Sequence, residues 1–187
     1  MSYIIPCSAS KQQPEIVNNR YESFEDFLND PQMPFPELNP TRMLLYNEIV
    51  GQQPLNFNST LPAYQLYSGP HACLYNRVSN QNWTKALTDV KIVSALFGLI
   101  THTTHIPIYN LKMDSILADG RTVWRVWYDE NALQGQINPT DVDLLNNLYR
   151  KAIHGNINPV AIEPPVQWRD RYGYHRGRWL NEQLGLL

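Results

Sequence analysis

A lysine and an aspartate stand close together in the middle of the chain, within the segment IPIYNLKMD that runs from Ile106 to Asp114. On an extended segment Lys112 and Asp114 share one face, and Tyr109 points to the other. A lysine beside a carboxylate suits general acid–base catalysis or the binding of anions and hydroxyls. A solvated surface ion pair is the competing interpretation, because such pairs are common and weak.

A second set of reactive side chains follows the first apolar segment, in the sequence CSASK from Cys7 to Lys11. Small residues such as Ser8 at a strand exit let backbone N–H groups approach an anion. Lys11 could then bind a phosphate, or act as a nucleophile if it is buried and deprotonated. Cys7 could be a nucleophile only if its pKa were depressed. The alternatives are a solvated lysine and a core cysteine.

Two further motifs place small and aromatic residues where strands end. Tyr67 and Gly69 lie in YQLYSGP, where a tyrosine at a sheet edge can stack on a base or simply be a strand aromatic. Ser94, Phe97 and Gly98 lie in the apolar run VKIVSALFGLI, whose glycine permits close backbone approach. Ligands of α/β proteins bind at strand exits, so we expect these residues to line a substrate pocket.

Arginines alternate with aromatic residues near the end of the chain, a pattern that suits phosphate contacts and base stacking. The net charge of −2 excludes a globally basic nucleic-acid binder, but an acidic first third and a basic tail leave room for a local surface facing a polyanion. The alternative is a tail that packs its aromatics on the domain. The candidate nucleic-acid-binding residues are Trp168, Arg169, Arg171, Tyr172, Arg176 and Arg178.

Strands and helices alternate along the chain, which predicts a single α/β domain with a mixed, largely central sheet flanked by helices. Strands are expected at 2–6, 63–67, 90–95, 122–128 and 160–162. Ser23 and Asp26 form a capping box before a short helix, Asn39 caps a second helix, and Thr140 with Asp143 caps a third that runs to about residue 151. We expect residues 1–164 to form the α/β domain and 165–187 a C-terminal extension.

Composition narrows the class of protein further. The chain of 187 residues is 43% hydrophobic, yet it lacks an apolar run long enough to span a membrane, and its first residues do not resemble a signal peptide. We therefore expect a cytoplasmic protein that does not bind membranes. The two cysteines form no metal-binding pair, and His102 with His105 lack a third ligand, so neither a metal nor a cofactor is expected.

Taken in order, these motifs resemble the YaaA family of peroxide stress proteins and its small relatives. The resemblance covers roughly residues 2 to 130. It implies an α/β domain that binds DNA and contains a pocket. The larger members carry a helix-hairpin-helix-like element, whereas the segment after Asn39 lacks the glycine hairpin, which makes the tail the better candidate for contacting DNA. The matching positions are Ser8, Lys11, Tyr67, Gly69, Ser94, Phe97, Gly98, Pro107, Tyr109, Leu111 and Met113.

Our first hypothesis for function is an enzyme that cleaves the N-glycosidic bond of a base in DNA or in a nucleotide. Such an enzyme takes the base out of the stack, and Lys11, Lys112 or Asp114 would act near the sugar. The alternative is a non-catalytic DNA-binding stress protein in which Lys11 and Lys112 hold phosphates of duplex or single-stranded DNA. A third possibility is a pocket for a free nucleotide. The sequence does not predict an oligomeric state.

Overall fold

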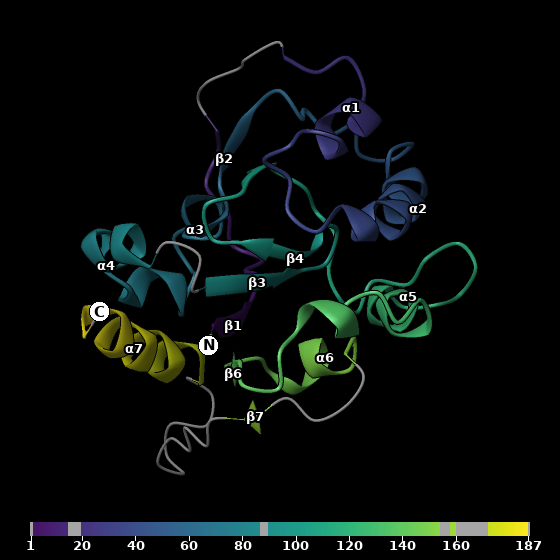
Figure 1. The fold of residues 1–187 in the computed structure, drawn as a ribbon. Coiled ribbons are helices and arrows are strands. Elements are labelled where there is room, and N and C mark those ends of the chain that lie inside the picture. Colours follow the sequence, from purple (N-terminus) through teal and green to yellow (C-terminus); the bar gives the residue numbers. More distant parts are fainter. Residues whose placement is uncertain (1, 15–19, 87–89, 154–157, 160–171, 187) are drawn as a thin grey trace.

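The computed structural model describes residues 2–14, 20–86, 90–153, 158–159 and 172–186. Its main sheet has the strand order β4-β3-β1-β6-β7 (Figure 1). The central strand β1 (Tyr3–Pro6) runs parallel to β3 (Val90–Ser94) and to β6 (Val142–Asp143). β7 (Asn158–Pro159) is parallel to β6, and β4 (Gly98–Thr101) is antiparallel to β3. The expected mixed sheet is confirmed.

Helices surround this sheet, and a second sheet pairs β2 (Thr60–Pro62) with β5 (His105–Pro107) in antiparallel fashion. In Figure 1, α3, α4 and α7 lie on one side, α1 and α2 lie above the sheet, and α5 lies on the opposite side. The helices are α1 (Phe24–Leu28), α2 (Asn39–Ile49), α3 (Ala63–Leu66), α4 (Asn80–Lys85), α5 (Val123–Asp129), α6 (Asn147–Arg150) and α7 (Tyr172–Gly185). In the described parts of the chain, short 3-10 helices are η1 (Pro36–Leu38), η2 (Tyr75–Arg77) and η3 (Gln134–Gln136).

The apolar run from Val90 to Ile100 forms two strands of a hairpin rather than one strand. Gly98 adopts a φ of 63°, a left-handed conformation that reverses the chain between β3 and β4. The Ser94 hydroxyl accepts the Phe97 N–H at 3.1 Å and closes the turn. β3 lies between β4 and β1, and β1 is the central strand of this sheet because β6 pairs with its other edge.

Two segments expected to be strands are helices. Residues 63–66 form α3, and residues 123–129 form α5, whose buried positions Val123, Val126 and Trp127 follow the helical period. The third predicted helix is also wrong at its start, because Asp143 belongs to β6 and the helix α6 is short and capped by Asn146. The strand expected at 160–162 lies outside the described residues.

The two helices predicted nearer the N-terminus are both present, with starts at or next to the expected residues. Ser23 and Asp26 make both hydrogen bonds of the expected capping box at the start of α1. Asn39 is the first residue of α2 rather than its cap, because its side chain donates to Leu28 and accepts from Arg42. α2 buries Thr41, Arg42 and Leu45.

Arg42 is a fully buried arginine that ties α2 to the β3–β4 hairpin. Its guanidinium donates to the carbonyl of Phe97 at 2.8 Å, and to those of Leu99 and Pro34 at 3.0 Å. Burial lowers the pKa of Arg42 to about 10, and the charge of Glu37 opposes this shift. The side chain thus satisfies two backbone carbonyls of the turn that carries Gly98 and the carbonyl of Pro34 before η1.

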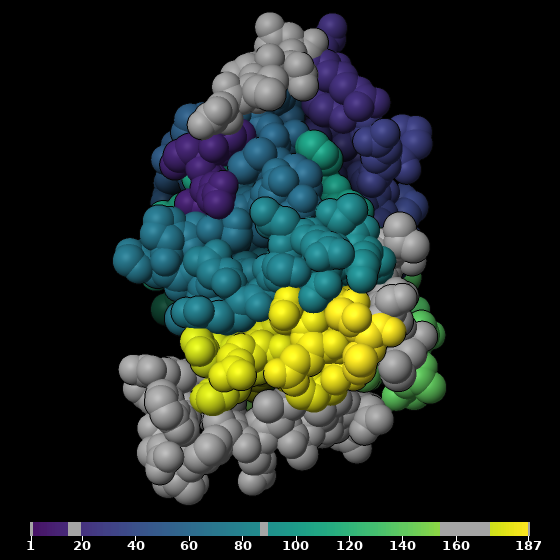
Figure 2. Space-filling model, turned by 90° about the vertical axis from the view of Figure 1, so that its left-hand side faces the viewer, coloured from purple at the N-terminus to yellow at the C-terminus, as the bar shows by residue number. Residues whose placement is uncertain are grey.

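The C-terminal helix α7 packs closely on η2 and α4, as Figure 2 shows for the yellow segment against the teal one. Gly177 allows this contact, since a side-chain carbon there would lie 2.3 Å from the Leu74 carbonyl oxygen. Trp179 meets the Tyr3 ring edge-on at 5.9 Å. Among the described helices, none is both long and apolar enough to cross a lipid bilayer.

Candidate functional site

The loop after β1 is held firmly by backbone contacts, and it presents Lys11. The Cys7 N–H donates to the Val93 carbonyl at 2.9 Å, which extends the β1–β3 pairing, and the Gln12 N–H donates to Leu66 at 2.8 Å. Gly69 packs against the loop so closely that a side-chain carbon there would lie 2.6 Å from the Lys11 amide nitrogen. The role of Gly69 is therefore to let the two segments meet.

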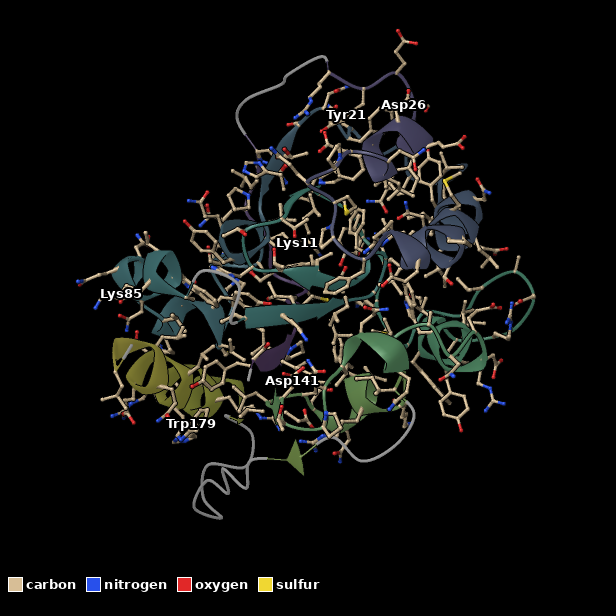
Figure 3. All side chains as sticks on the ribbon, viewed as in Figure 1. Lys11, Tyr21, Asp26, Lys85, Asp141 and Trp179 are labelled. Carbon is tan, nitrogen blue, oxygen red and sulfur yellow. The ribbon has the colours of Figure 1, made fainter. Side chains whose placement is uncertain are left out.

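Lys11 extends from this loop over two tyrosine rings. Its Nζ atom lies 4.6 Å from the centre of the Tyr109 ring and 5.8 Å from that of Tyr67. Desolvation by burial lowers the pKa of Lys11, and the neighbouring Cys7 opposes this shift. Figure 3 places Lys11 near the middle of the molecule, whereas Lys85 lies at the periphery on α4. A lysine in this setting loses its proton more readily than one in water.

Three hydroxyl groups form a closed triangle beneath this lysine. The Tyr67 and Tyr109 hydroxyls lie 2.7 Å apart, and the Ser94 hydroxyl lies 3.1 Å from the first and 2.8 Å from the second. All three side chains are at most 1% exposed. Burial raises the pKa of both tyrosines, so their hydroxyls stay protonated and available as donors. Their buried rings thus support Lys11 and leave no free face for stacking.

Cys7 connects the triangle to Tyr149, which sequence reasoning missed. The Cys7 sulfur lies 3.1 Å from the Tyr149 hydroxyl and accepts from Tyr109 at 3.8 Å. Tyr149 belongs to α6, and no motif or spacing near it points to Cys7. Burial is the main reason that the pKa of Tyr149 is raised, and the charges of Cys7 and Asp114 add to it.

Lys112 and Asp114 are exposed, whereas Tyr109, Leu111 and Met113 are buried. Burial thus alternates along the segment as expected, with the two charged side chains on the side opposite to Tyr109, and the chain turns at Met113 and Asp114. The charge of Asp114 contributes to the raised pKa of Tyr149, and Asp114 forms no ion pair with Lys11 among the described residues. The structure gives Lys112 no contact with the hydroxyl triangle.

Phe97 and Gly98 shape the hairpin instead of facing the loop. Phe97 is fully buried, and its ring lies edge-on to Tyr109 with the centroids 5.6 Å apart. Gly98 packs against Trp127, whose ring would lie 2.6 Å from a side-chain carbon at this position. Both residues hold Ser94 and Tyr109 in place.

A cleft of about 590 Å³ opens beside the loop that follows β1. Cys7, Ser8 and Ser10 line it together with His71, Asn146 and Arg176. No carboxylate is among the residues that line this cleft, and Arg176 supplies a positive charge. Such a lining favours an anion over a cation. Cys7 belongs both to the cleft and to the network under Lys11.

The C-terminal candidates divide into several groups. Arg178 is exposed on α7, and Arg176 lines the cleft. Tyr174 is covered by the Arg77 guanidinium, 4.3 Å from its ring centre. Tyr172 begins α7. Trp168, Arg169 and Arg171 lie outside the residues that the structure describes.

His102 and His105 do not converge. His102 is buried against Trp83, with its Nε2 atom 3.1 Å from the Trp83 carbonyl oxygen, and His105 contacts the Thr60 hydroxyl on the surface. Burial lowers the pKa of His105. In the part of the chain that the structure describes, no three potential ligands gather around one point as a metal ion would require.

The geometry defines an α/β protein whose loop after the first strand presents a half-buried lysine above a network of tyrosine, serine and cysteine. A family model described as "Peroxide stress protein YaaA" matches residues 3–171. The chain therefore belongs to the YaaA family of peroxide stress proteins. A search of curated proteins gave no match.

Proposed function

We propose that this protein acts on DNA and cleaves the N-glycosidic bond of a base, with Lys11 as the nucleophile. The observation that carries the proposal is the position of the Lys11 amine, desolvated and held over Tyr109. A lysine whose pKa is lowered by burial is more often deprotonated, and the free amine is the form that attacks carbon centres. Because perturbed lysines cluster at functional sites, Lys11 is the strongest candidate for chemistry in the described structure.

In the proposed reaction, the free amine of Lys11 attacks C1′ of the deoxyribose. The N–C1′ bond forms while the bond from C1′ to the base breaks, and the base leaves with that electron pair and takes up a proton. The attacking nitrogen gives up one proton, which balances the proton taken up by the base. The nitrogen lone pair then forms the C=N bond as the C1′–O4′ bond breaks, O4′ takes up a proton from solvent, and a protonated Schiff base with Lys11 results. The ring of Tyr109 lies under the attacking amine, and the network of hydroxyl groups behind it holds this ring in place. Asp114 would stabilise positive charge at the edge of the site.

DNA is the proposed substrate because positive charge flanks the loop. Arg176 lines the cleft, and the exposed Arg178 adds a second positive charge on the same helix, so α7 offers charges for a phosphate backbone. Membership in a stress-protein family agrees with work on damaged or modified bases. Both cysteines are free thiols, which suits a reducing compartment such as the cytoplasm.

The test uses duplex and single-stranded DNA, plain and with modified bases, and measures released bases together with borohydride trapping of a covalent protein–DNA adduct. Wild type should release base and form the adduct, and Lys11→Ala should lose both. The matched control is Lys85→Ala, which removes an exposed lysine far from the loop. Lys112→Ala should also keep activity.

The alternative is a non-catalytic DNA-binding stress protein. In that case DNA is retained at low salt with neither base release nor a trapped adduct, and Lys11→Ala only weakens binding in a salt-dependent way. This result would overturn the enzymatic proposal. Loss of base release in Lys112→Ala but not in Lys11→Ala would move the catalytic role to the exposed segment.

A further inference from the structure

We propose that a second pocket, lined by Gln12 next to Lys11 in the sequence, binds a nucleobase that carries an exocyclic amino group. The pocket has a volume of about 490 Å³, which suits a nucleoside-sized ligand. Its polar lining is made mainly of side-chain amides, from Gln12, Gln65, Asn76 and Asn80. This inference rests on the proposed function for its place in the reaction.

Two of these amides have their orientation fixed by carbonyl partners. The Gln12 side-chain nitrogen donates to the Ser68 carbonyl at 3.2 Å, and that of Asn76 donates to the Gly69 carbonyl at 2.9 Å. A carbonyl oxygen can only accept, so the nitrogen of each amide must face it. The amide oxygen of each side chain is then the atom left for a ligand, and both oxygens are acceptors.

The other polar group in the pocket complements these acceptors. The Tyr64 hydroxyl accepts from the Gln65 amide at 3.0 Å, which leaves its own proton for donation. The amide oxygens of the pocket can accept from an exocyclic amino group, and the Tyr64 hydroxyl can donate to a neighbouring ring nitrogen. Adenine and cytosine both present an amino group beside a ring nitrogen. A base with a carbonyl at that position would bring two acceptors together.

The pocket also offers aromatic contact and excludes charge. Tyr64 stacks on Trp83 with ring centroids 5.5 Å apart, which holds the tyrosine ring rigid at the wall of the pocket. No charged side chain is among the lining residues. A neutral, flat ring with hydrogen-bonding edges is therefore favoured over an anion or a cation.

The position of the pocket connects it to the catalytic lysine. Gln12 follows Lys11 directly, and Tyr75 lines both this pocket and the cleft. The loop from Cys7 to Gln12 thus separates an uncharged, amide-lined pocket from a cleft that favours anions. A nucleotide with its base in the first and its phosphate in the second would bring its sugar to the loop that carries Lys11.

The test is calorimetric titration of the full chain with adenosine, inosine, cytidine and uridine. Adenosine should bind about tenfold more tightly than inosine, and cytidine about tenfold more tightly than uridine. Gln12→Ala should abolish this preference, and Gln65→Ala should reduce it. The control is Gln81→Ala, which removes an exposed amide of α4 outside the pocket and should keep the preference.

Circular dichroism must show that each variant is folded; because Gln12 is exposed, its substitution leaves the core intact. Equal binding of all four nucleosides, no binding by folded wild type, or a preference that survives Gln12→Ala would each overturn the inference. Because nucleoside binding needs no catalysis, the two proposals fail separately. If nucleosides bind in a way that depends on Gln12 but no base is released from DNA, only the proposed reaction is rejected. If base is released but nucleoside binding does not depend on Gln12, only the proposed pocket is rejected.

Discussion

Burial of the charged Lys11 side chain lowers the stability of the fold while it places the amine in the candidate site. Its ammonium leaves water on folding and meets tyrosine rings rather than a carboxylate. No ion pair with a carboxylate is formed by Lys11 among the described residues, and the charge of Cys7 offsets its desolvation only in part. A lysine kept under these conditions is better explained by chemistry than by stability.

This reasoning predicts that Lys11→Met stabilises the protein at pH 7 by about 0.5–2 kcal/mol while it abolishes the proposed activity. The pKa of Lys11 in the folded state lies below the ordinary value of 10.5, so below that pH the unfolded state binds the proton more tightly than the folded state does. The charged lysine therefore opposes folding at pH 7, and this cost disappears when the lysine is neutral in both states. The stabilisation should therefore shrink as the pH approaches 10.5 from below. Urea unfolding at pH 7 and pH 10 measures it, and a destabilised variant at pH 7 would contradict the prediction.

Ser94 gives a second prediction at this scale. Ser94→Ala removes the hydroxyl that accepts from Phe97 and pairs with Tyr67 and Tyr109, all in the dry interior. Leaving these groups with fewer partners should destabilise the fold by about 1–3 kcal/mol. Chemical denaturation is the measurement. Thr84→Ala, an exposed hydroxyl on α4, is the control and should change the free energy of unfolding by less than about 0.5 kcal/mol.

At the scale of elements, the β3–β4 hairpin controls the geometry of the site. Arg42 binds the carbonyls on either side of Gly98, and Trp127 donates its ring N–H to Ala95 at 2.9 Å. Helices α2 and α5 thus clamp the turn from two directions. Because Ser94 ends β3 and Phe97 of the turn packs on Tyr109, the position of the hairpin determines the hydroxyl triangle.

We therefore expect Gly98→Ala to destabilise the protein by about 2–4 kcal/mol. The new methyl group would meet the Trp127 ring, which its hydrogen bond to Ala95 holds in place, and the φ of 63° disfavours alanine. Gly120→Ala is the matched control, because its φ of 84° carries the conformational cost but its surroundings are open. Thermal unfolding of both variants measures the difference, and equal losses would show that the ring contact has no effect.

At the scale of the whole molecule, α7 joins the end of the described chain to segments near its middle. It packs on η2 and α4, and Asn181 accepts from the Ser79 N–H at 2.8 Å. α7 also supplies Arg176 to the cleft. The helix is thus a part of the wall that surrounds the loop of Lys11.

Gly177→Ala should separate α7 from η2, because the added methyl group would collide with the Leu74 backbone. Alanine is more favourable than glycine in a helix by about 1 kcal/mol, which alone would stabilise the variant. We expect a net loss of stability of about 1–3 kcal/mol, and this loss must come from the disturbed contact between α7 and η2. Hydrogen exchange of the α7 amides measures this loss. The control Gly185→Ala meets no backbone atom within 4 Å, and its exchange should stay the same or slow.

The sequence by itself predicted the features that depend on neighbouring residues. The first strand, the capping box of Ser23, the extended segment with Tyr109 inside and the class of fold all follow from local preferences and periodicity. The order of the short motifs was enough to predict the family. Lys11 was a candidate because a lysine after a small-residue strand exit is informative without any distant partner.

Only the tertiary structure decided which distant groups meet. Tyr149 contacts Cys7 across 142 positions of sequence, Arg42 caps a hairpin more than 50 residues away, and the amides of Gln12 and Asn76 gather around one pocket. It also turned two apparent strands into helices, because burial on one face outweighed the preference of β-branched and aromatic residues for strands. Local sequence determines backbone preference, whereas the path of the whole chain determines contacts, burial and therefore pKa.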